Sequence, residues 1–349
     1  DLKMTDGNNR RFRVYSYNLT SEYLIDKTKI AKATTVSAYT DKFGYLKLSV
    51  IRKRPWIDRT KIRRGLSFSV LYPLMRLLPL KTNTVVFESL WGQLFNDSPR
   101  AMYEYLVAQH PSMKFVWVFK DEQTPISGPG VRVRRMSFKY WYYMARAKYL
   151  VQNTNLPNQY AKRRGQIEVE TLHGTFMKVM GFDEPHFKQA SNNIQKKFAY
   201  RIGRWDLMSV PSDFMLEHGA RAFDYPEQKI VTTGFPRTDE LIQNNHATYI
   251  QKIKHYLRIP ADKQVVLYAP TYRTTDEPFD LALDLERVQA ALGNDYVLLM
   301  RLHYFVSHSQ NFVNQSGFVY DVSDYNNIND LYLISDVLIT DYSSVMFDF

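Results

Sequence analysis

Side chains suited to binding phosphate follow three predicted strands in the last third of the chain. The strands are Val265-Val-Leu-Tyr-Ala-Pro, Tyr296-Val-Leu-Leu-Met-Arg and Val337-Leu-Ile-Thr. In an open α/β sheet, ligands bind in the crevice outside the carboxyl ends of the strands. We therefore expect the polar residues at these three ends to converge on one anionic ligand. They are Thr271, Arg273, Arg301, His303, Asp341, Ser343 and Ser344.

These residue types match the charge of a phosphate group. The Arg301 guanidinium can grip a phosphate with two parallel hydrogen bonds, and His303, two residues later, would point to the same side of a strand. A protonated imidazole there can neutralise developing charge or protonate a leaving group. Ser343 and Ser344 would add hydroxyl donors at a helix N-terminus. The alternatives are a structural histidine at 303 and a plain helix N-cap at 343.

An earlier histidine suits a general base. His173 stands in Leu172-His-Gly-Thr-Phe-Met-Lys, at the end of another predicted strand. Gly174 permits close backbone approach, and an imidazole on such a turn can take a proton from a bound hydroxyl. The alternative is a buried histidine that donates to a carbonyl. Arg237, in Gly234-Phe-Pro-Arg-Thr-Asp, is either a phosphate ligand or the salt-bridge partner of Asp239.

The composition excludes several classes of protein. The chain has no cysteine, which removes disulfides and thiolate metal sites. It contains no His-Glu-x-x-His, no Walker loop and no G-x-G-x-x-G, which argues against zinc hydrolysis, NTP hydrolysis and dinucleotide redox chemistry. We expect neither a metal nor a cofactor. The net charge of +11 predicts an anionic partner.

The elements that must position these groups alternate between strand and helix from residue 83 onward. This order predicts an α/β fold with doubly wound parallel sheets, and 349 residues suffice for two such domains and a smaller piece. Ser98, followed by Pro99, and Ser212 are expected N-caps of helices. Because Ser343-Ser344 opens a helix that is cut off at Phe349, we expect the second domain to be incomplete. The predicted parts are an accessory β segment (1–51), a basic amphipathic segment (52–82), an N-terminal Rossmann-like domain (83–245) and a C-terminal Rossmann-like domain (246–349).

The segment 52–82 combines basic residues with an apolar stretch from Leu66 to Leu80. It is too short to cross a bilayer but could lie on an anionic membrane surface. The alternative is a basic linker followed by a core helix, since Pro73 and Pro79 would interrupt a long helix. The residues predicted to face the membrane are Arg52, Lys53, Arg54, Trp56, Lys61, Arg63 and Arg64.

Taken together, the motifs resemble the CDP-glycerol glycerophosphotransferase family of teichoic acid primases and polymerases. The matching stretches are Phe87-Glu-Ser-Leu-Trp-Gly, Ser98-Pro-Arg-Ala-Met-Tyr-Glu-Tyr-Leu, Glu170-Thr-Leu-His-Gly-Thr-Phe, Gly234-Phe-Pro-Arg-Thr-Asp, Tyr268-Ala-Pro-Thr-Tyr-Arg, Met300-Arg-Leu-His and the run from Ser335 to Phe349. The resemblance implies a GT-B-like fold, with two Rossmann-like halves facing a cleft. It departs from the family at Leu172, Phe176 and Tyr304, where other members commonly have Trp, Pro and Pro.

The resemblance also implies roles for individual residues. His173 matches the family's base, and His303 matches the histidine set against the donor phosphates. Further candidates near the site are Gly174, Thr175, Arg273 and Asp341. The positions that match the family's donor-binding residues are Arg237, Pro270, Thr271, Arg301, Leu302, Ser343, Ser344 and Asp348.

The predicted reaction is transfer of glycerol phosphate or ribitol phosphate from a CDP-polyol to the terminal hydroxyl of a lipid-linked wall teichoic acid acceptor, with release of CMP. The predicted partners are CDP-glycerol or CDP-ribitol, the acceptor and an anionic membrane surface, at the cytoplasmic face of the bacterial membrane. We expect no nucleic acid partner, and the sequence leaves a homo-oligomer open. Two other hypotheses are a GT-B glycosyltransferase that uses a nucleotide sugar and a non-catalytic protein that binds polyanions.

Overall fold

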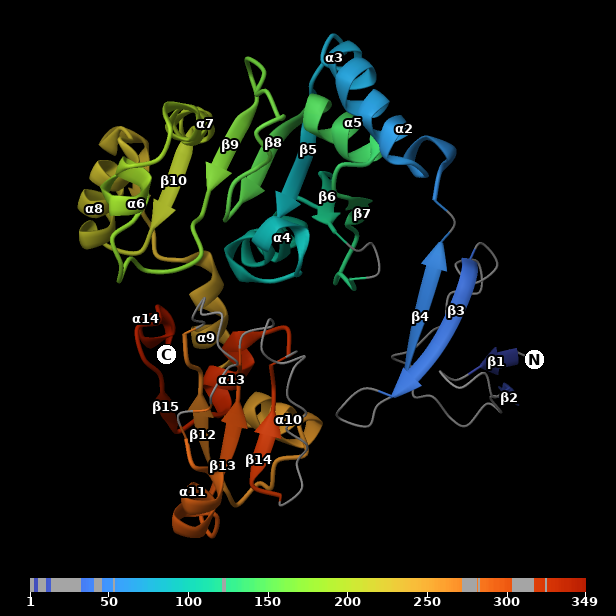
Figure 1. Ribbon diagram of the computed structural model, residues 1–349. Helices are drawn as coiled ribbons and strands as arrows, with labels where there is room; N and C mark the ends of the chain where they lie inside the picture. Colours follow the sequence, from blue (N-terminus) through green and yellow to red (C-terminus); the bar gives the residue numbers. More distant parts are fainter. Residues whose placement is uncertain are drawn as a thin grey trace.

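The computed structural model describes residues 3–5, 11–13, 33–40, 46–52, 54–120, 124–271, 281, 283–302, 317–323 and 325–349. Two parallel sheets form two lobes, one above the other in Figure 1. We call them the N-terminal lobe, built on strands β5 to β11, and the C-terminal lobe, built on strands β12 to β15. Both lobes have the doubly wound α/β architecture that the sequence predicts.

The N-terminal lobe contains a seven-stranded sheet of order β11-β10-β9-β8-β5-β6-β7, and every pair in it is parallel. The chain starts at β5, adds two strands on one side, and then crosses to the other side at β8. The switch point of the sheet therefore lies between β5 and β8. Its strands are β5 (Lys81–Glu88), β6 (Lys114–Phe119), β7 (Val131–Arg134), β8 (Ala147–Gln152), β9 (Ile167–Glu170), β10 (Leu207–Val210) and β11 (Ile230–Thr232).

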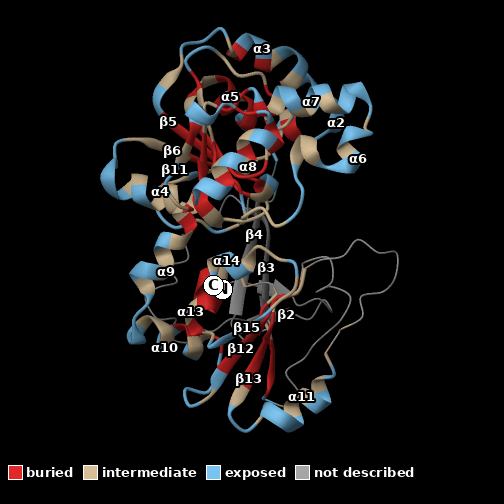
Figure 2. Ribbon diagram, turned by 90° about the vertical axis from the view of Figure 1, so that its left-hand side faces the viewer, coloured by how far each residue is buried: buried red, intermediate tan, exposed pale blue. Residues whose placement is uncertain are grey.

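Helices cover both faces of this sheet, so its central strands are buried over most of their length, as the red strands in Figure 2 show. Aromatic rings dominate one side of the core, where Phe87 stacks on Trp117 with ring centroids 5.3 Å apart. Ser137 and Ser212 cap their helices by accepting hydrogen bonds from the backbone N–H three residues later. The covering helices are α4 (Asp97–Gln109), α5 (Phe138–Arg146), α6 (Pro185–Lys188), α7 (Asn192–Ile202) and α8 (Asp213–Phe223).

The C-terminal lobe repeats this plan with four parallel strands of order β14-β13-β12-β15. The switch point lies between β12 and β15. Its core is mainly aliphatic, with Val265, Leu267 and Leu299 fully buried. The strands are β12 (Gln264–Tyr268), β13 (Tyr296–Met300), β14 (Val319–Asp321) and β15 (Val337–Ile339), and the helices are α9 (Asp239–Asn244), α10 (Ala247–Tyr256), α11 (Leu285–Leu292), α13 (Ile328–Ile334) and α14 (Val345–Asp348).

The N-terminal residues form two antiparallel strand pairs, β1 (Lys3–Thr5) with β2 (Arg11–Arg13) and β3 (Ala33–Thr40) with β4 (Leu46–Arg52). A helical run follows, made of α2 (Lys61–Leu66), a π-helical turn (Ser67–Leu71) and α3 (Tyr72–Met75). No helix among the described residues has the length and apolar character needed to cross a membrane.

Several boundaries differ from the sequence predictions. Strand β5 begins at Lys81, inside the segment predicted to end at residue 82. Helix α4 begins at Asp97 with Asn96 as N-cap, so the prediction of Ser98 as N-cap is wrong; its hydroxyl is buried without a hydrogen-bond partner. Pro73 does not interrupt the helical run, because it lies in the first turn of α3, where a missing N–H costs nothing. Strands β7 and β11, the two edge strands of the N-terminal sheet, were not expected.

Candidate active site

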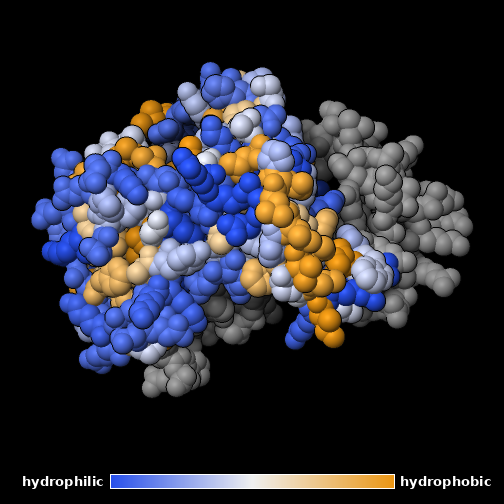
Figure 3. Space-filling view, turned by 90° about the horizontal axis from the view of Figure 1, so that it is seen from above, coloured by the Kyte–Doolittle hydropathy of each residue, from blue (hydrophilic) through white to orange (hydrophobic). Residues whose placement is uncertain are grey.

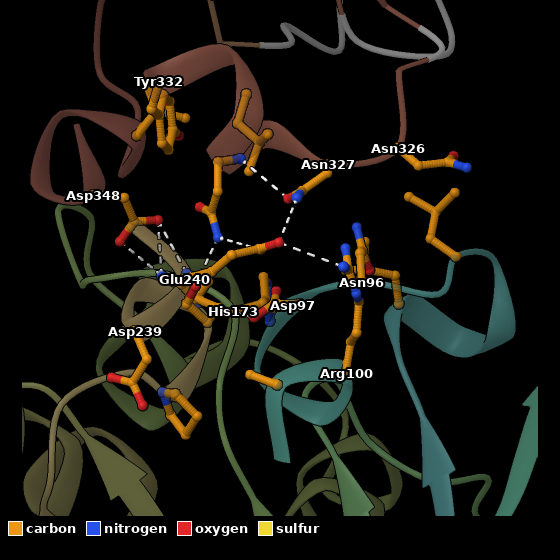
Figure 4. Close-up of a pocket in the computed structure, with 18 of the residues that line it drawn as sticks. Asn96, Asp97, Arg100, His173, Asp239, Glu240, Asn326, Asn327, Tyr332 and Asp348 are labelled. Atoms are coloured by element: carbon orange, nitrogen blue, oxygen red, sulfur yellow. Dashed lines mark hydrogen bonds and ion pairs between the residues drawn. The ribbon is translucent and has the colours of Figure 1, made fainter. Parts of the chain in front are cut away.

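A cleft runs between the two lobes at the carboxyl ends of both sheets. Its two hollows share four lining residues, His173 from the N-terminal lobe and Thr271, Ser343 and Ser344 from the C-terminal lobe. Figure 4 shows the larger hollow, with His173, Asp97 and Asp348 among the residues that line it. The structure therefore brings residues that lie far apart in the sequence to one place, which is what the strand-end pattern predicts.

His173 has one ring nitrogen engaged and the other available. Its Nδ1 lies 2.7 Å from the carbonyl oxygen of Asn153, at the end of β8. A carbonyl can only accept, so Nδ1 carries a proton, and in the neutral imidazole Nε2 holds the lone pair. The side chain is exposed at the cleft. The predicted alternative is thus half right, because His173 does donate to a carbonyl, but it is not buried.

A buried polar network holds the two strand ends on either side of His173. The Gln152 amide donates to Glu170 Oε2 at 2.6 Å, and its carbonyl oxygen accepts from the backbone N–H groups of Thr154 and Asn155. Glu170 Oε1 accepts from the N–H of Leu172 at 2.8 Å. Burial raises the pKa of Glu170 to about 8, although these two donors lower it. The network fixes the loop that supplies the Asn153 carbonyl and the turn that carries His173.

The two lobes are close to each other beside this histidine. A Cβ added to Gly174 would lie 2.5 Å from Ser344 Oγ and 3.1 Å from Ser344 Cβ. Only glycine fits that spacing without a shift. The predicted need for close approach at Gly174 therefore has a specific partner, the first turn of α14 in the opposite lobe. Thr175 follows and lines the smaller hollow.

The C-terminal lobe contributes hydroxyl groups at its own switch point. Asp341, after β15, accepts from the N–H of Thr271, after β12, at 2.7 Å, and so ties the two strand ends together. Among the residues that the structure describes, the buried Thr271 hydroxyl has no hydrogen-bond partner, which is the state of a group that awaits a ligand. Ser344 is the N-cap residue of α14, and Ser343 precedes it in the wall of the cleft.

Arg301 and Leu302 lie in the same wall, but each is engaged within the protein. Strand β13 ends at Met300, so Arg301 lies just beyond it, and its Nη1 donates to the carbonyls of Val322 and Tyr325. Leu302 is 3% exposed, and its N–H donates to Ser323 Oγ. Leu302 therefore offers a ligand only a small accessible surface. Pro270 also lines the cleft.

Arg237 is the main ionic link across the cleft. Its guanidinium forms two hydrogen bonds with the Asp348 carboxylate, each 3.0 Å long, and one with Asp97 at 3.2 Å. Burial alone would lower the pKa of Arg237, but the two carboxylates outweigh it and raise it. The predicted salt bridge with Asp239 is wrong, because Asp97 on α4 and Asp348 on α14 take its place. The guanidinium also lies 4.0 Å from the centroid of the Phe235 ring.

Three predicted residues cannot be placed, since His303, Arg273 and Lys53 lie outside the described residues. Sequence analysis also missed residues that shape the site. Asp97, Asn153 and Gln152 had no signal of their own, because their roles depend on neighbours from other strands. Trp91 falls in one of the motifs but carried no prediction.

The larger part of the chain matches one family of enzymes. Residues 70–349 match the family model described as CDP-Glycerol:Poly(glycerophosphate) glycerophosphotransferase. The chain belongs to this family. A solved structure of the wall teichoic acid polymerase TagF, soaked with CDPG, superposes with a TM-score of 0.78 at 34% identity, over 82% of this chain and 72% of that one. The predicted family and GT-B-like fold are thereby confirmed.

Two curated relatives differ in the polyol that their names contain. The teichoic acid poly(glycerol phosphate) polymerase of Bacillus subtilis (strain 168) is 37% identical over 304 residues, which are 83% of this chain and 41% of the relative. The teichoic acid poly(ribitol-phosphate) polymerase of Bacillus spizizenii is 29% identical over 305 residues, or 81% of this chain and 46% of the relative. The chain thus spans less than half the length of either of these two relatives.

Proposed function

We propose that this chain transfers glycerol phosphate from CDP-glycerol to the terminal hydroxyl of a lipid-linked wall teichoic acid acceptor. The observation that carries the proposal is the state of His173. Its Nδ1–H is bound to the Asn153 carbonyl, so its basic nitrogen is Nε2, and it lines a cleft whose other wall supplies hydroxyl groups for an anionic donor. Family membership supports the reaction class.

In the proposed step, the acceptor hydroxyl oxygen attacks the β-phosphorus of CDP-glycerol. A new P–O bond forms, the bond from that phosphorus to the CMP oxygen breaks, and His173 Nε2 takes the hydroxyl proton. Thr271, Ser343 and Ser344 donate hydrogen bonds to the pyrophosphate oxygens as negative charge moves to CMP. Arg237 could join them only by exchanging a carboxylate partner for phosphate. For His303 we retain the predicted role at the donor phosphates.

Glycerol is the proposed polyol because identity is higher to the glycerol phosphate polymerase than to the ribitol-phosphate polymerase, 37% against 29%. The test offers CDP-glycerol and CDP-ribitol separately to the purified protein with a lipid-linked acceptor and measures CMP. We expect CMP from CDP-glycerol only in the presence of acceptor. Equal release from CDP-ribitol would overturn the choice of polyol, and no release from either would overturn the reaction.

We also propose that the helical run 61–75 lies on the anionic cytoplasmic face of the bacterial membrane. One side of the run packs on the core, where the Tyr72 ring lies 4.9 Å from the Trp141 ring. The opposite side exposes an apolar stripe at helical spacing, part of the orange strip in Figure 3. The exposed fractions are 87% for Ile62, 43% for Leu66, 45% for Val70, 56% for Leu74 and 80% for Leu77.

Basic residues beside this stripe support the proposal. Arg54 and Trp56 are exposed at its start, and the Arg63 guanidinium lies 4.1 Å from the centroid of the Trp56 ring. Lys61 is exposed, whereas Arg64 is partly buried. The test is flotation with vesicles of anionic or zwitterionic lipid. We expect binding to anionic vesicles that Leu74→Glu with Leu77→Glu removes, while Ile194→Glu, on exposed α7, leaves it intact. Equal binding by both variants would contradict the proposal.

A further inference from the structure

We infer that Trp91 is a binding residue for the acceptor, on which the carbon skeleton of the terminal glycerol phosphate unit rests beside His173. This inference builds on the proposed function, because it assigns the place of the acceptor in that reaction. Trp91 belongs to a short 3-10 turn, Leu90–Gly92, that directly follows β5. The turn is thus at the switch point of the N-terminal lobe, where ligands of doubly wound sheets bind.

The backbone of this turn has an uncommon conformation. Leu90, Trp91 and Gly92 have φ values of 45°, 55° and 76°, all in the left-handed region. Non-glycine residues seldom adopt it, and they keep it only where the surrounding structure imposes it. Glycine is required at 92, because a Cβ there would lie 3.1 Å from the backbone nitrogen of Lys120. Strain of this kind is typical of sites that hold a ligand.

Two neighbouring segments hold the turn in place, the loop after β8 and the end of β6. The N–H of Leu90 donates to Asn153 Oδ1 at 2.9 Å, and the N–H of Trp91 donates to Thr154 Oγ1 at 3.3 Å. The Gly92 carbonyl accepts from Lys120 N at 2.6 Å, at the end of β6. These contacts satisfy the backbone of the turn without involving the indole, so the conformation does not depend on the Trp91 side chain.

The same loop that holds the turn also holds His173. Asn153 is fully buried, its side chain binds the turn, and its carbonyl accepts from His173 Nδ1. One residue therefore sets the positions of the imidazole and of the turn that carries the indole. Both residues belong to the N-terminal lobe and line the same larger hollow.

The indole itself is available for a ligand. Trp91 is 43% exposed, whereas Trp117, Trp141 and Trp205 are among the largest fully buried side chains of the chain. Within the described ranges, no hydrogen bond or ring contact involves its side chain. An indole offers an apolar face and one N–H donor. These match the CH and CH2 groups of a glycerol unit and an oxygen of its phosphate, and such a unit would present its hydroxyl toward His173.

The test compares Trp91→Gly with Trp91→Phe. Glycine adopts positive φ without strain, so we expect Trp91→Gly to melt at the wild-type temperature or above it. We expect its Kd for a poly(glycerol phosphate) oligomer with a free terminal hydroxyl, measured by calorimetry, to rise roughly tenfold. Trp91→Phe keeps an aromatic face but loses the indole N–H, so its Kd should lie between those of the wild type and Trp91→Gly. Phe214→Ala, which removes a half-exposed ring on α8 outside both hollows, is the matched control.

The outcomes separate this inference from the proposed function. Trp91→Gly should also raise the KM for acceptor in the CMP assay and leave the KM for CDP-glycerol unchanged. Wild-type affinity for the oligomer in Trp91→Gly, an equal loss in Phe214→Ala, or no binding by the wild-type protein would each overturn the inference. If the wild-type protein binds the oligomer and Trp91→Gly does not, but no CMP is released, the proposed reaction fails and the binding role of Trp91 stands.

Discussion

The two lobes share a topology, but their cleft-facing groups are held in different ways. Each sheet has its switch point at the cleft, between β5 and β8 in one lobe and between β12 and β15 in the other. In the N-terminal lobe, hydrogen bonds fix both His173 and the Leu90–Gly92 turn. In the C-terminal lobe, the Thr271 hydroxyl is buried with no hydrogen-bond partner within the described part of the chain. The cleft wall of the N-terminal lobe therefore presents groups that hydrogen bonds already hold in position. The wall of the C-terminal lobe presents a hydroxyl that can still form a hydrogen bond.

This difference fits the two tasks of a transferase. A general base must be held in one tautomer and one orientation before the substrate arrives. A hydroxyl that binds phosphate contributes only when the ligand replaces its missing partner, since an unpaired buried hydroxyl destabilises the empty protein. In the proposed reaction, the N-terminal lobe would prepare the nucleophile, and the C-terminal lobe would gain stability when the donor binds.

The largest expected effect concerns His173, in the wall formed by the N-terminal lobe. We expect His173→Ala to lower CMP release by about 10²- to 10⁴-fold, the usual contribution of a general base, with little change in melting temperature because the side chain is exposed. His218→Ala, a partly buried histidine on α8 that stacks on Phe214 and lines neither hollow, is the control and should retain activity. Residual activity within threefold of wild type in His173→Ala would remove the base from the mechanism.

The next largest effect concerns the contact between Gly174 and Ser344, which joins the two lobes. Gly174→Ala would bring its Cβ to 2.5 Å from Ser344 Oγ, and an overpacked contact of this kind costs about 1–3 kcal/mol. We expect the KM for CDP-glycerol to rise and CMP release to fall, measured with a soluble acceptor. Adding Ser344→Gly removes the opposing side chain and should recover part of the melting temperature. Gly65→Ala is the control, because nothing lies within 4 Å of its added Cβ.

Thr271→Val tests the wall formed by the C-terminal lobe. Valine keeps the shape and removes a buried hydroxyl that has no partner, so we expect unfolding in urea to require the same free energy or about 1 kcal/mol more. Donor affinity should fall roughly tenfold, the usual loss for a hydrogen bond to a charged group, as measured by calorimetry with CDP-glycerol. A variant that is both less stable and equal in affinity would show that the hydroxyl serves the fold.

The smallest effect concerns pH and the network below His173. Burial raises the pKa of Glu170 from 4.5 to about 8 and that of Glu168 to about 7. As the pH rises from 4.5, the unfolded chain loses these protons before the folded chain does, so stability should fall until the pH passes 8. Glu170→Gln should flatten this slope in urea unfolding between about pH 5 and 8.5, and Glu217→Gln, exposed on α8, should not. A wild-type stability that rises with pH would contradict the shift.

Much of the fold followed from local pattern. Strand alternation predicted two doubly wound sheets, because buried parallel strands are continuous apolar runs that periodic helices separate. Ser212 was recognisable as an N-cap, since capping depends on residues three apart. The sequence did not predict strands β7 and β11, because both are edge strands that lack a continuous buried apolar run.

For the site, the sequence by itself determined which residues stand at strand ends, and hence that His173, Thr271, Ser343 and Ser344 would line one cleft. It did not determine how each is engaged. Arg237 pairs with Asp97 and Asp348, 140 and 111 residues away, and Asn153 joins His173 to the Trp91 turn. Only the tertiary structure decided these contacts, because a hydrogen bond depends on distance and direction between groups that the chain brings together from separate strands.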